Sequence, residues 1–470
     1  MSVPPRTDAE RSSSTGTERA SSTDAGRPSS ADAERTSSTG AGRTLPARPW
    51  FLGVLAVLAA ATVVAHDRVI PLGQPLWGFF RNGLDLLVYR SGGATVLTDA
   101  GLYDHALHGG MWWTYPPFSA VIFAPLRLFS PEMTTLLGYL VNFVALYLVV
   151  LLCWRQLGYR ANRTLYVATG LLTVVLSVIE PVRTTIWLGQ VNLLLMLLIV
   201  WDLGRPEGSR LRGIGVGIAA GIKLTPALFV VHLLLTRQWR AAATAVAGFA
   251  ATVAVGCVVI FSDSRAYWTG VIWHSTRIGE TAWPANQSAS GVLARWLHLA
   301  EPPRLLWLGV AVALAGLGLA AALLAHRRGH ALLAVTLCGL TSCAVSPFSW
   351  GHHWVWFVPL LILAMDRALR SGRAVAWLLP AALALPLLIW AHGFPDGVYG
   401  IGLFMVPAPA ALAPIFAAVY PLLFVVIAAT TLVALARTGP AAGPKTPAEP
   451  CDLPHITVGS QPGLDRAATS

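Results

Sequence analysis

The sequence predicts an all-α, polytopic integral membrane protein, and three observations point to it. Of the 470 residues, 55% are hydrophobic and only 12% are charged, about half the charged share of a soluble domain. Apolar stretches recur between Trp50 and Arg437, and one bilayer crossing needs about 20 mostly apolar residues. Nearly all cations are Arg, and the arginines of the membrane domain lie mainly in short loops at one face, as expected of cytoplasmic loops. The net charge of +11 therefore indicates membrane orientation rather than nucleic-acid binding.

The chain divides into a membrane domain, residues 49–437, between two polar tails. The first tail, 1–48, carries an eight-residue repeat from Ala9, with Arg at positions 11, 19, 27, 35 and 43. The repeat has nothing apolar to bury, so we expect a disordered cytoplasmic segment. We expect the same of the Pro- and Gly-rich tail 438–470. The five cysteines show no zinc-site spacing, and we expect neither a disulfide nor a metal site.

The membrane domain contains eleven apolar segments, each a predicted helix: 50–66, 133–154, 164–180, 187–203, 213–236, 240–262, 303–325, 330–346, 353–366, 374–391 and 411–436. Segment 213–236 has Arg on both sides, so a single crossing would place one Arg cluster outside. Pro226 interrupts this segment, and proline breaks a helix. Two short helices meeting at the break restore the parity and give about twelve crossings. Gly213, Gly217 and Gly221 form a ladder of small residues suited to helix packing.

Three longer connections, residues 67–132, 263–302 and 392–410, then lie at the outer face. A short apolar stretch after Tyr115-Pro116-Pro117-Phe118 looks like an interfacial helix. Trp and Tyr crowd the borders of these connections, as they do at membrane interfaces.

Asp85 and Lys223 are the charged residues that most need an explanation. Asp85 is an acid among apolar residues in the first outer connection. Two interpretations have equal weight. Asp85 is either a helix cap or partner for Arg90, or a general base whose pKa is raised by desolvation. Lys223 is the only Lys of the membrane domain and sits at the helix break. Snorkelling to the surface is the plain interpretation, whereas an intramembrane cation is by default a functional candidate, here for a lipid phosphate.

Other polar residues lie at the same predicted face. His352, His353 and Trp350 are either interfacial anchors or donors to phosphate and sugar. Arg183 follows Glu180 by three residues, and a Glu–Arg pair of this kind is more often structural than functional. Amide side chains in an apolar setting must bond across helices or to sugar hydroxyls. Four such amides are candidate contacts: Gln190, Asn192, Asn286 and Gln287. Tyr115 is a further candidate at this face. The convergence of all these residues on one face is a stronger signal than any one of them.

Several motifs, in this order, resemble the family 87 glycosyltransferases of the GT-C superfamily over roughly residues 50–437. They are GLDLLVYRSGG at 83–93, TYPPFSAVIFAPL at 114–126, IEPVRTTIWLGQVNLLLML at 179–197, GIKLTPA at 221–227, NQSASG at 286–291 and SPFSWGHHWVWFVPL at 346–360. The segments are most similar to polyprenol-phosphate-mannose-dependent α-1,2-mannosyltransferases of mycobacteria, especially those acting on phosphatidylinositol mannosides. Ala289 stands where that group would carry Trp, which leaves the acceptor open among phosphatidylinositol mannoside, lipomannan and lipoarabinomannan.

The resemblance implies a GT-C fold and an inverting transfer at the outer face of the plasma membrane, without a cofactor. Asp85 would be the catalytic base. Lys223, His352, His353 and Arg183 would bind the donor phosphate. The sugar or the acceptor would contact the remaining candidates: Tyr115, Gln190, Asn192, Asn286, Gln287 and Trp350. The implied partners are a polyprenyl-phosphate-mannose donor, a mannosylated glycolipid acceptor and the lipid bilayer.

Two alternatives stay open. An arabinofuranosyltransferase that uses a decaprenyl-phosphate donor belongs to the same class and has the same fold. A membrane transporter or lipid flippase would also have about twelve helices, broken segments and intramembrane polar residues. That class favours two similar halves and a polar path to both faces, whereas here the hydrophobic pattern does not repeat and the candidates gather outside.

Overall fold

The computed structural model describes residues 42–46, 49–98, 100–274, 277–388, 391–395 and 397–437. The chain divides into two compact units, residues 1–43 and 44–470, and the described helices and strands belong to the second. The two tails predicted to be disordered, 1–48 and 438–470, lie almost wholly outside the described residues.

Among the described residues, five helices are long and apolar enough to cross a membrane: α2 (Pro49–Val69), α5 (Pro131–Gln156), α11 (Trp239–Val259), α14 (Arg304–Arg327) and α19 (Val419–Arg437). A bent pair, α6 (Arg163–Leu176) and α7 (Glu180–Leu188), turns by 84° at its break and could form a sixth span. The chain is therefore a helical membrane protein, as predicted. Most exposed side chains of these helices are apolar, which suits a lipid environment.

The other predicted spans are shorter or interrupted, so length alone gives five or six crossings in the described part rather than twelve. These segments are α8 (Asn192–Leu203), α9 (Ile214–Ile222), η3 (Thr225–Ala227), α10 (Leu228–Leu235), α15 (Ala331–Val345), η6 (Gly351–Trp356), α16 (Phe357–Ser371), η7 (Ala374–Trp377) and α17 (Leu378–Leu388). A helix rises about 1.5 Å per residue, so α9 and α10 each reach less than halfway through a bilayer.

The predicted break in segment 213–236 is present, and it makes a hairpin. Gly213, Gly217 and Gly221 lie against residues progressively further along α11, so α9 runs parallel to α11. The chain then returns through α10 to the start of α11, where Arg212 Nε donates to Gln238 Oε1 over 2.9 Å. The segment thus enters and leaves at the same end of the bundle, which is the geometry that the flanking arginines required. The glycine ladder is the packing surface, as predicted.

The arginine-bearing loops meet at this same end. Gln156 Nε2 donates to the Val200 carbonyl over 2.8 Å, which joins the α5–α6 loop to the end of α8. His326 lies 3.8 Å from Glu207, and Tyr159 donates to Asp366 over 3.1 Å. Four loops far apart in sequence are therefore neighbours.

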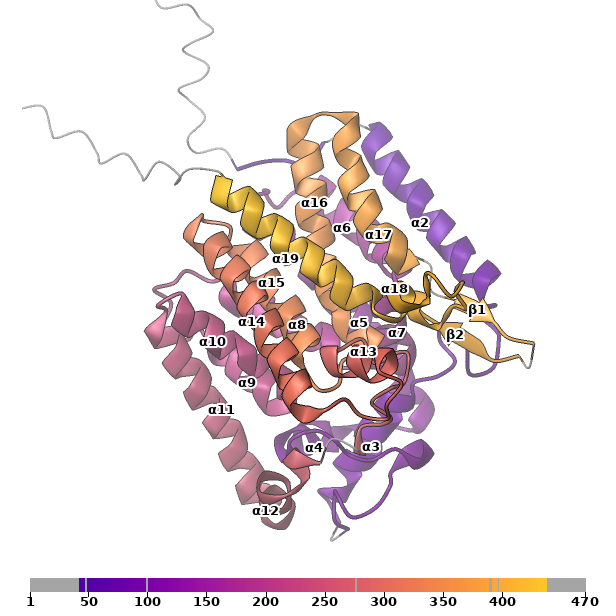
Figure 1. The fold of residues 1–470 in the computed structure, drawn as a ribbon, viewed down its shortest axis with the longest axis vertical. Coiled ribbons are helices and arrows are strands. Elements are labelled where there is room, and N and C mark those ends of the chain that lie inside the picture. Colours follow the sequence, from indigo (N-terminus) through magenta and orange to yellow (C-terminus); the bar gives the residue numbers. More distant parts are fainter. Residues whose placement is uncertain are drawn as a thin grey trace, which may run out of the picture. The chain divides into compact units, whose positions relative to one another are not determined.

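The opposite end carries the long connections (Figure 1). They form mostly short helices: α3 (Leu84–Thr95), η1 (His108–Gly110), α4 (Pro117–Phe123), η2 (Ala124–Leu128), α12 (Phe261–Thr269), η4 (Val271–Trp273), α13 (Ala289–Trp296), η8 (Leu403–Met405) and α18 (Ala413–Ala417). The strands β1 (Ala391–Gly393) and β2 (Tyr399–Ile401) form an antiparallel hairpin. The described part of the chain is mostly helical, as predicted. This short hairpin was not predicted, because three-residue strands leave no periodic pattern of apolar residues in the sequence.

Candidate active site

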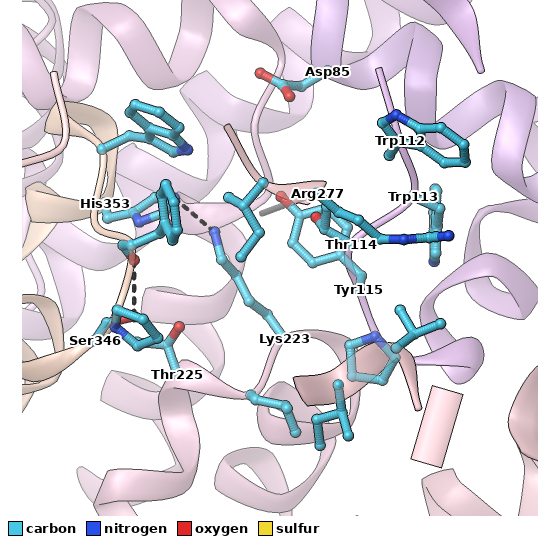
Figure 2. Close-up of a pocket in the computed structure, with 18 of the residues that line it drawn as sticks. Asp85, Trp112, Trp113, Thr114, Tyr115, Lys223, Thr225, Arg277, Ser346 and His353 are labelled. Atoms are coloured by element: carbon cyan, nitrogen blue, oxygen red, sulfur yellow. Dashed lines mark hydrogen bonds between the residues drawn. The ribbon is translucent and has the colours of Figure 1, made fainter. Parts of the chain in front are cut away.

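A cavity of about 410 Å³ opens among the long connections. Its lining includes most of the predicted reactive residues: Asp85 from α3, Tyr115 before α4, Gln190 between α7 and α8, Lys223 from the break after α9, and His353 from η6. Segments separated by more than 250 residues therefore supply one site. Figure 2 shows Lys223 extending between His353 and Tyr115, with Asp85 on a separate part of the wall.

Lys223 ends α9 in an extended conformation, with φ −149° and ψ 129°, so its side chain leaves the helix and enters the cavity. Its ammonium donates to Asn192 Oδ1 over 3.0 Å and to His353 Nε2 over 2.9 Å. It also lies 5.3 Å from the centre of the Tyr115 ring. Because an ammonium only donates, Nε2 of His353 is the acceptor and its proton is on Nδ1. The break thus creates a fixed positive charge at the cavity.

Asp85 lies in the first turn of α3 and is half-buried at the cavity wall. Desolvation raises the pKa of its carboxyl group to about 6, although a hydrogen bond from Gln190 and the charge of Lys223 oppose that rise. A carboxylate with this pKa is ionised near neutral pH and is also able to accept a proton there. The general base predicted at Asp85 requires this property.

Two buried tyrosines hold the amide of Gln190 in place. Tyr89 donates to Gln190 Oε1 over 2.9 Å, and Tyr115 donates to the same oxygen over 3.4 Å. Burial raises the pKa of both hydroxyl groups above the ordinary tyrosine value, so both remain donors. Sequence reasoning missed Tyr89, although it follows Asp85 by four residues on one helix face, a spacing that places side chains together.

Arg277 and Trp112 form another part of the lining that the sequence analysis did not single out. Arg277 Nη1 donates to the Tyr103 carbonyl over 2.7 Å, and its guanidinium carbon lies 4.6 Å from the centre of the Trp112 ring. Cation–π contact and a backbone hydrogen bond together hold this arginine against the wall. Nothing in the local sequence separates Arg277 from the other arginines of the long connections.

Two predicted phosphate ligands lie outside the cavity lining. Arg183 is 1% exposed, donates to the Trp77 carbonyl over 2.8 Å and lies 5.2 Å from the centre of the Trp187 ring. The His352 ring also lies outside the lining, and its backbone carbonyl accepts hydrogen bonds from Thr185 and Asn192. Of the adjacent histidines, His353 is therefore the one that faces the cavity.

Asn286 and Gln287 are fully buried away from the cavity, and their amides bond to protein groups. Asn286 accepts from the backbone N–H of Ser349 over 3.0 Å and donates to the Thr281 carbonyl over 3.0 Å. Gln287 donates to the Pro284 and Ala417 carbonyls. Trp350, by contrast, reaches the cavity. Within the described part of the chain, no three His, Cys, Asp or Glu residues are grouped so that they could hold a metal ion.

The sequence profile of Glycosyltransferase family 87 matches residues 113–347, a stretch that includes Tyr115, Gln190 and Lys223. A curated relative from Mycobacterium tuberculosis (strain CDC 1551 / Oshkosh) is 36% identical over 384 residues, which cover 77% of this chain and 86% of the relative. The chain belongs to glycosyltransferase family 87. It is therefore a glycosyltransferase, and the cavity is its candidate active site.

Three curated relatives similar to this chain are named as mannosyltransferases. The relative above is a "Polyprenol-phosphate-mannose-dependent alpha-(1-2)-phosphatidylinositol pentamannoside mannosyltransferase". A protein with the same name from Mycolicibacterium smegmatis is 36% identical over 71% of this chain and 80% of the relative. A phosphatidylinositol mannoside mannosyltransferase from Mycobacterium tuberculosis (strain ATCC 25618 / H37Rv) is 34% identical over 67% of this chain and 79% of the relative. No solved structure matches this glycosyltransferase.

Proposed function

We propose that this chain is a polyprenol-phosphate-mannose-dependent α-(1,2)-mannosyltransferase that acts on a phosphatidylinositol-mannoside-type glycolipid. The observation that carries the proposal is the single cavity that brings the carboxyl group of Asp85 together with the ammonium of Lys223. The named relatives use a lipid-linked mannose donor, and the cavity provides one group suited to deprotonate an acceptor and another suited to a phosphate.

The proposed reaction is a single displacement with inversion. Asp85 takes the proton of an acceptor mannose hydroxyl as its oxygen bonds to C1 of the β-mannosyl phosphate. The bond between C1 and the phosphate oxygen breaks, and its electron pair leaves with polyprenyl phosphate. An α-linkage results because the acceptor attacks from the opposite face.

The Lys223 ammonium beside the break suits the leaving group. As C1 separates, negative charge grows on the phosphate, and the fixed ammonium of Lys223 can balance it without reorganising. His353 keeps that ammonium in place through the 2.9 Å hydrogen bond. Trp112, Trp350 and Tyr115 present apolar and aromatic surface to the same cavity, which would orient the sugars and the prenyl chain.

The proposal also covers membrane topology. The arginine-bearing loops would face the cytoplasm, which places the cavity outside, both tails inside and about twelve crossings and re-entrant segments between. The grouping of those loops at the end away from the cavity supports this arrangement. Single cysteines are introduced at Glu207 and Glu280, and intact cells are treated with an impermeant maleimide. The cysteine at 280 should be labelled, whereas the cysteine at 207 should not. Labelling of the cysteine at 207 from outside would reverse the assignment.

A donor assay tests the activity. Full-length protein in liposomes is given radiolabelled polyprenyl-phosphate-mannose or polyprenyl-phosphate-arabinose, with phosphatidylinositol mannosides of increasing mannose number as acceptors. We expect transfer of mannose only, in an α-(1,2) linkage identified by NMR of the product. Transfer from the arabinose donor alone would make the enzyme an arabinofuranosyltransferase. Movement of labelled lipid between leaflets without transfer would favour a flippase instead.

A further inference from the structure

The turn Gly189–Asn192 lies directly against the helix that carries Asp85. The backbone N–H of Gly83, just before α3, donates to the Trp187 carbonyl at the end of α7 over 2.9 Å. Gly189 has φ +72°, and a Cβ atom there would lie 2.7 Å from Cβ of Leu86. Only glycine adopts this conformation and permits this approach at low cost. The turn and the start of α3 are therefore fixed relative to each other.

Gln190 presents its two amide atoms to different partners. Its Oε1 accepts from Tyr89 and Tyr115, and the residue is only 4% exposed. Since both tyrosines donate to the oxygen, the amide orientation is settled and Nε2 is left as the donor. Asp85 lines the same cavity, and a hydrogen bond from Gln190 opposes the rise in the pKa of its carboxyl group. A carboxylate held by a buried donor keeps one orientation and remains ionised more readily.

Asn192 similarly uses both ends of its amide. Its Nδ2 donates to the His352 carbonyl over 2.9 Å, and its Oδ1 accepts from Lys223 Nζ over 3.0 Å. The next residue after His352 is His353, the second partner of Lys223. Asn192 therefore connects the ammonium to the backbone of the segment that supplies its other ligand.

Building on the proposed function, we infer that the turn Gly189–Asn192 is the positioning element of the active site, with Gln190 orienting the Asp85 carboxylate and Asn192 fixing Lys223 beside His353. One residue, Val191, separates the amide that serves proton transfer from the amide that serves phosphate binding. One rigid turn thereby sets the distance between the base and the cation. Neither amide is then a primary sugar ligand, in contrast to the role expected from sequence.

The inference predicts different consequences for two substitutions by leucine. Gln190→Leu removes the donor to Asp85, so the acid limb of kcat/KM should move to higher pH by about one unit. Asn192→Leu leaves that limb in place, whereas the affinity for farnesyl phosphate, a short soluble probe of the leaving group, should fall about tenfold. Asn192→Asp keeps an acceptor for Lys223 but loses the donor to the His352 carbonyl and adds a negative charge, so it should not restore this affinity.

Two matched controls separate positioning from general loss of structure. Gln156→Leu removes an amide at the opposite end of the bundle, and Asn142→Leu removes a buried amide that donates to the Gly138 carbonyl within α5. Both should lower stability without moving the acid limb or the affinity for farnesyl phosphate. If Gln190→Leu and Asn192→Leu behave like these controls, the turn is merely structural and the inference is overturned.

A spectroscopic titration keeps this result independent of the proposed reaction. The infrared carboxyl band of Asp85 is identified by its loss in Asp85→Asn, and its titration is then compared between the native protein and Gln190→Leu. We expect the midpoint to rise in Gln190→Leu. An unchanged midpoint overturns the inference, whatever the enzyme transfers. An active Asp85→Asn variant with a shifted midpoint in Gln190→Leu would instead remove Asp85 as base and leave the contact intact.

Discussion

Two pairs of amide side chains at the cavity end of the bundle have the same chemistry and different surroundings. Gln190 and Asn192 bond to residues that line the cavity: Asn192 accepts from Lys223, and Gln190 accepts from Tyr89. Asn286 and Gln287 are equally buried, but their partners are backbone groups that join the 281–288 connection to Ser349 and α18. The first pair supports a site, and the second pair supports a loop.

The difference teaches that burial and polarity do not identify a binding residue. Each amide satisfies its hydrogen bonds, as buried polar groups must. What separates the pairs is whether the bonded partner itself faces the cavity. The predictions below use this criterion, beginning with the groups that the first pair holds and ending with the second pair.

Removing the base should have the largest effect. Asp85→Asn keeps the shape of the side chain but cannot take a proton, so kcat should fall about 10²- to 10⁴-fold, the usual contribution of a general base. Donor binding should remain, because Lys223 is untouched. Single-turnover rates with saturating donor measure this loss. Wild-type transfer by Asp85→Asn would show that Gln190 supports something other than the base.

Removing the cation should have the next largest effect. Lys223→Met removes the charge opposite the growing phosphate anion, and loss of one such group costs about 10²- to 10³-fold in rate. Lys223→Arg keeps the charge in a different shape, so its rate should lie between those of the native enzyme and Lys223→Met. The comparison rests on kcat/KM for the mannose donor. Equal activity of Lys223→Met and the native enzyme would break the link between Asn192 and the chemistry.

The pH dependence should reveal the environment of Asp85. Its pKa is raised to about 6, so the protonated, inactive form becomes populated at a higher pH than for an exposed aspartate. Below pH 6, kcat/KM should therefore fall about tenfold per pH unit. Initial rates in buffers from pH 4.5 to 8 test this. A flat profile down to pH 4.5 would contradict the proposed proton acceptor.

Changing the second pair should affect stability more than chemistry. Asn286→Leu leaves the backbone N–H groups of Ser349 and Ser288 without their side-chain acceptor, at a cost of about 1–3 kcal/mol for each unsatisfied buried group. The thermal midpoint should fall, and activity should fall only in proportion to the folded fraction. A selective loss of acceptor binding at an unchanged midpoint would return Asn286 to the set of sugar ligands.

Much of the architecture could be predicted because it depends on local composition. The long apolar helices follow from hydrophobic length, and the hairpin at Lys223 follows from a proline and the arginines on both sides. The β1–β2 hairpin escaped prediction because three-residue strands depend on pairing across a turn. Tyr89 escaped because its importance comes from Gln190, a partner 101 residues away.

By itself, the sequence determined a helical membrane protein with a break at Lys223 and an acid at Asp85, because bilayer burial and helix breaking act over short stretches. Only the tertiary structure decided which polar residues share the cavity. It placed His353 on the wall and the His352 ring outside the lining, buried Arg183 against Trp187 and Trp77, and separated the two amide pairs. These outcomes depend on the directions of side chains on helices that meet from distant parts of the chain, and no local pattern encodes them.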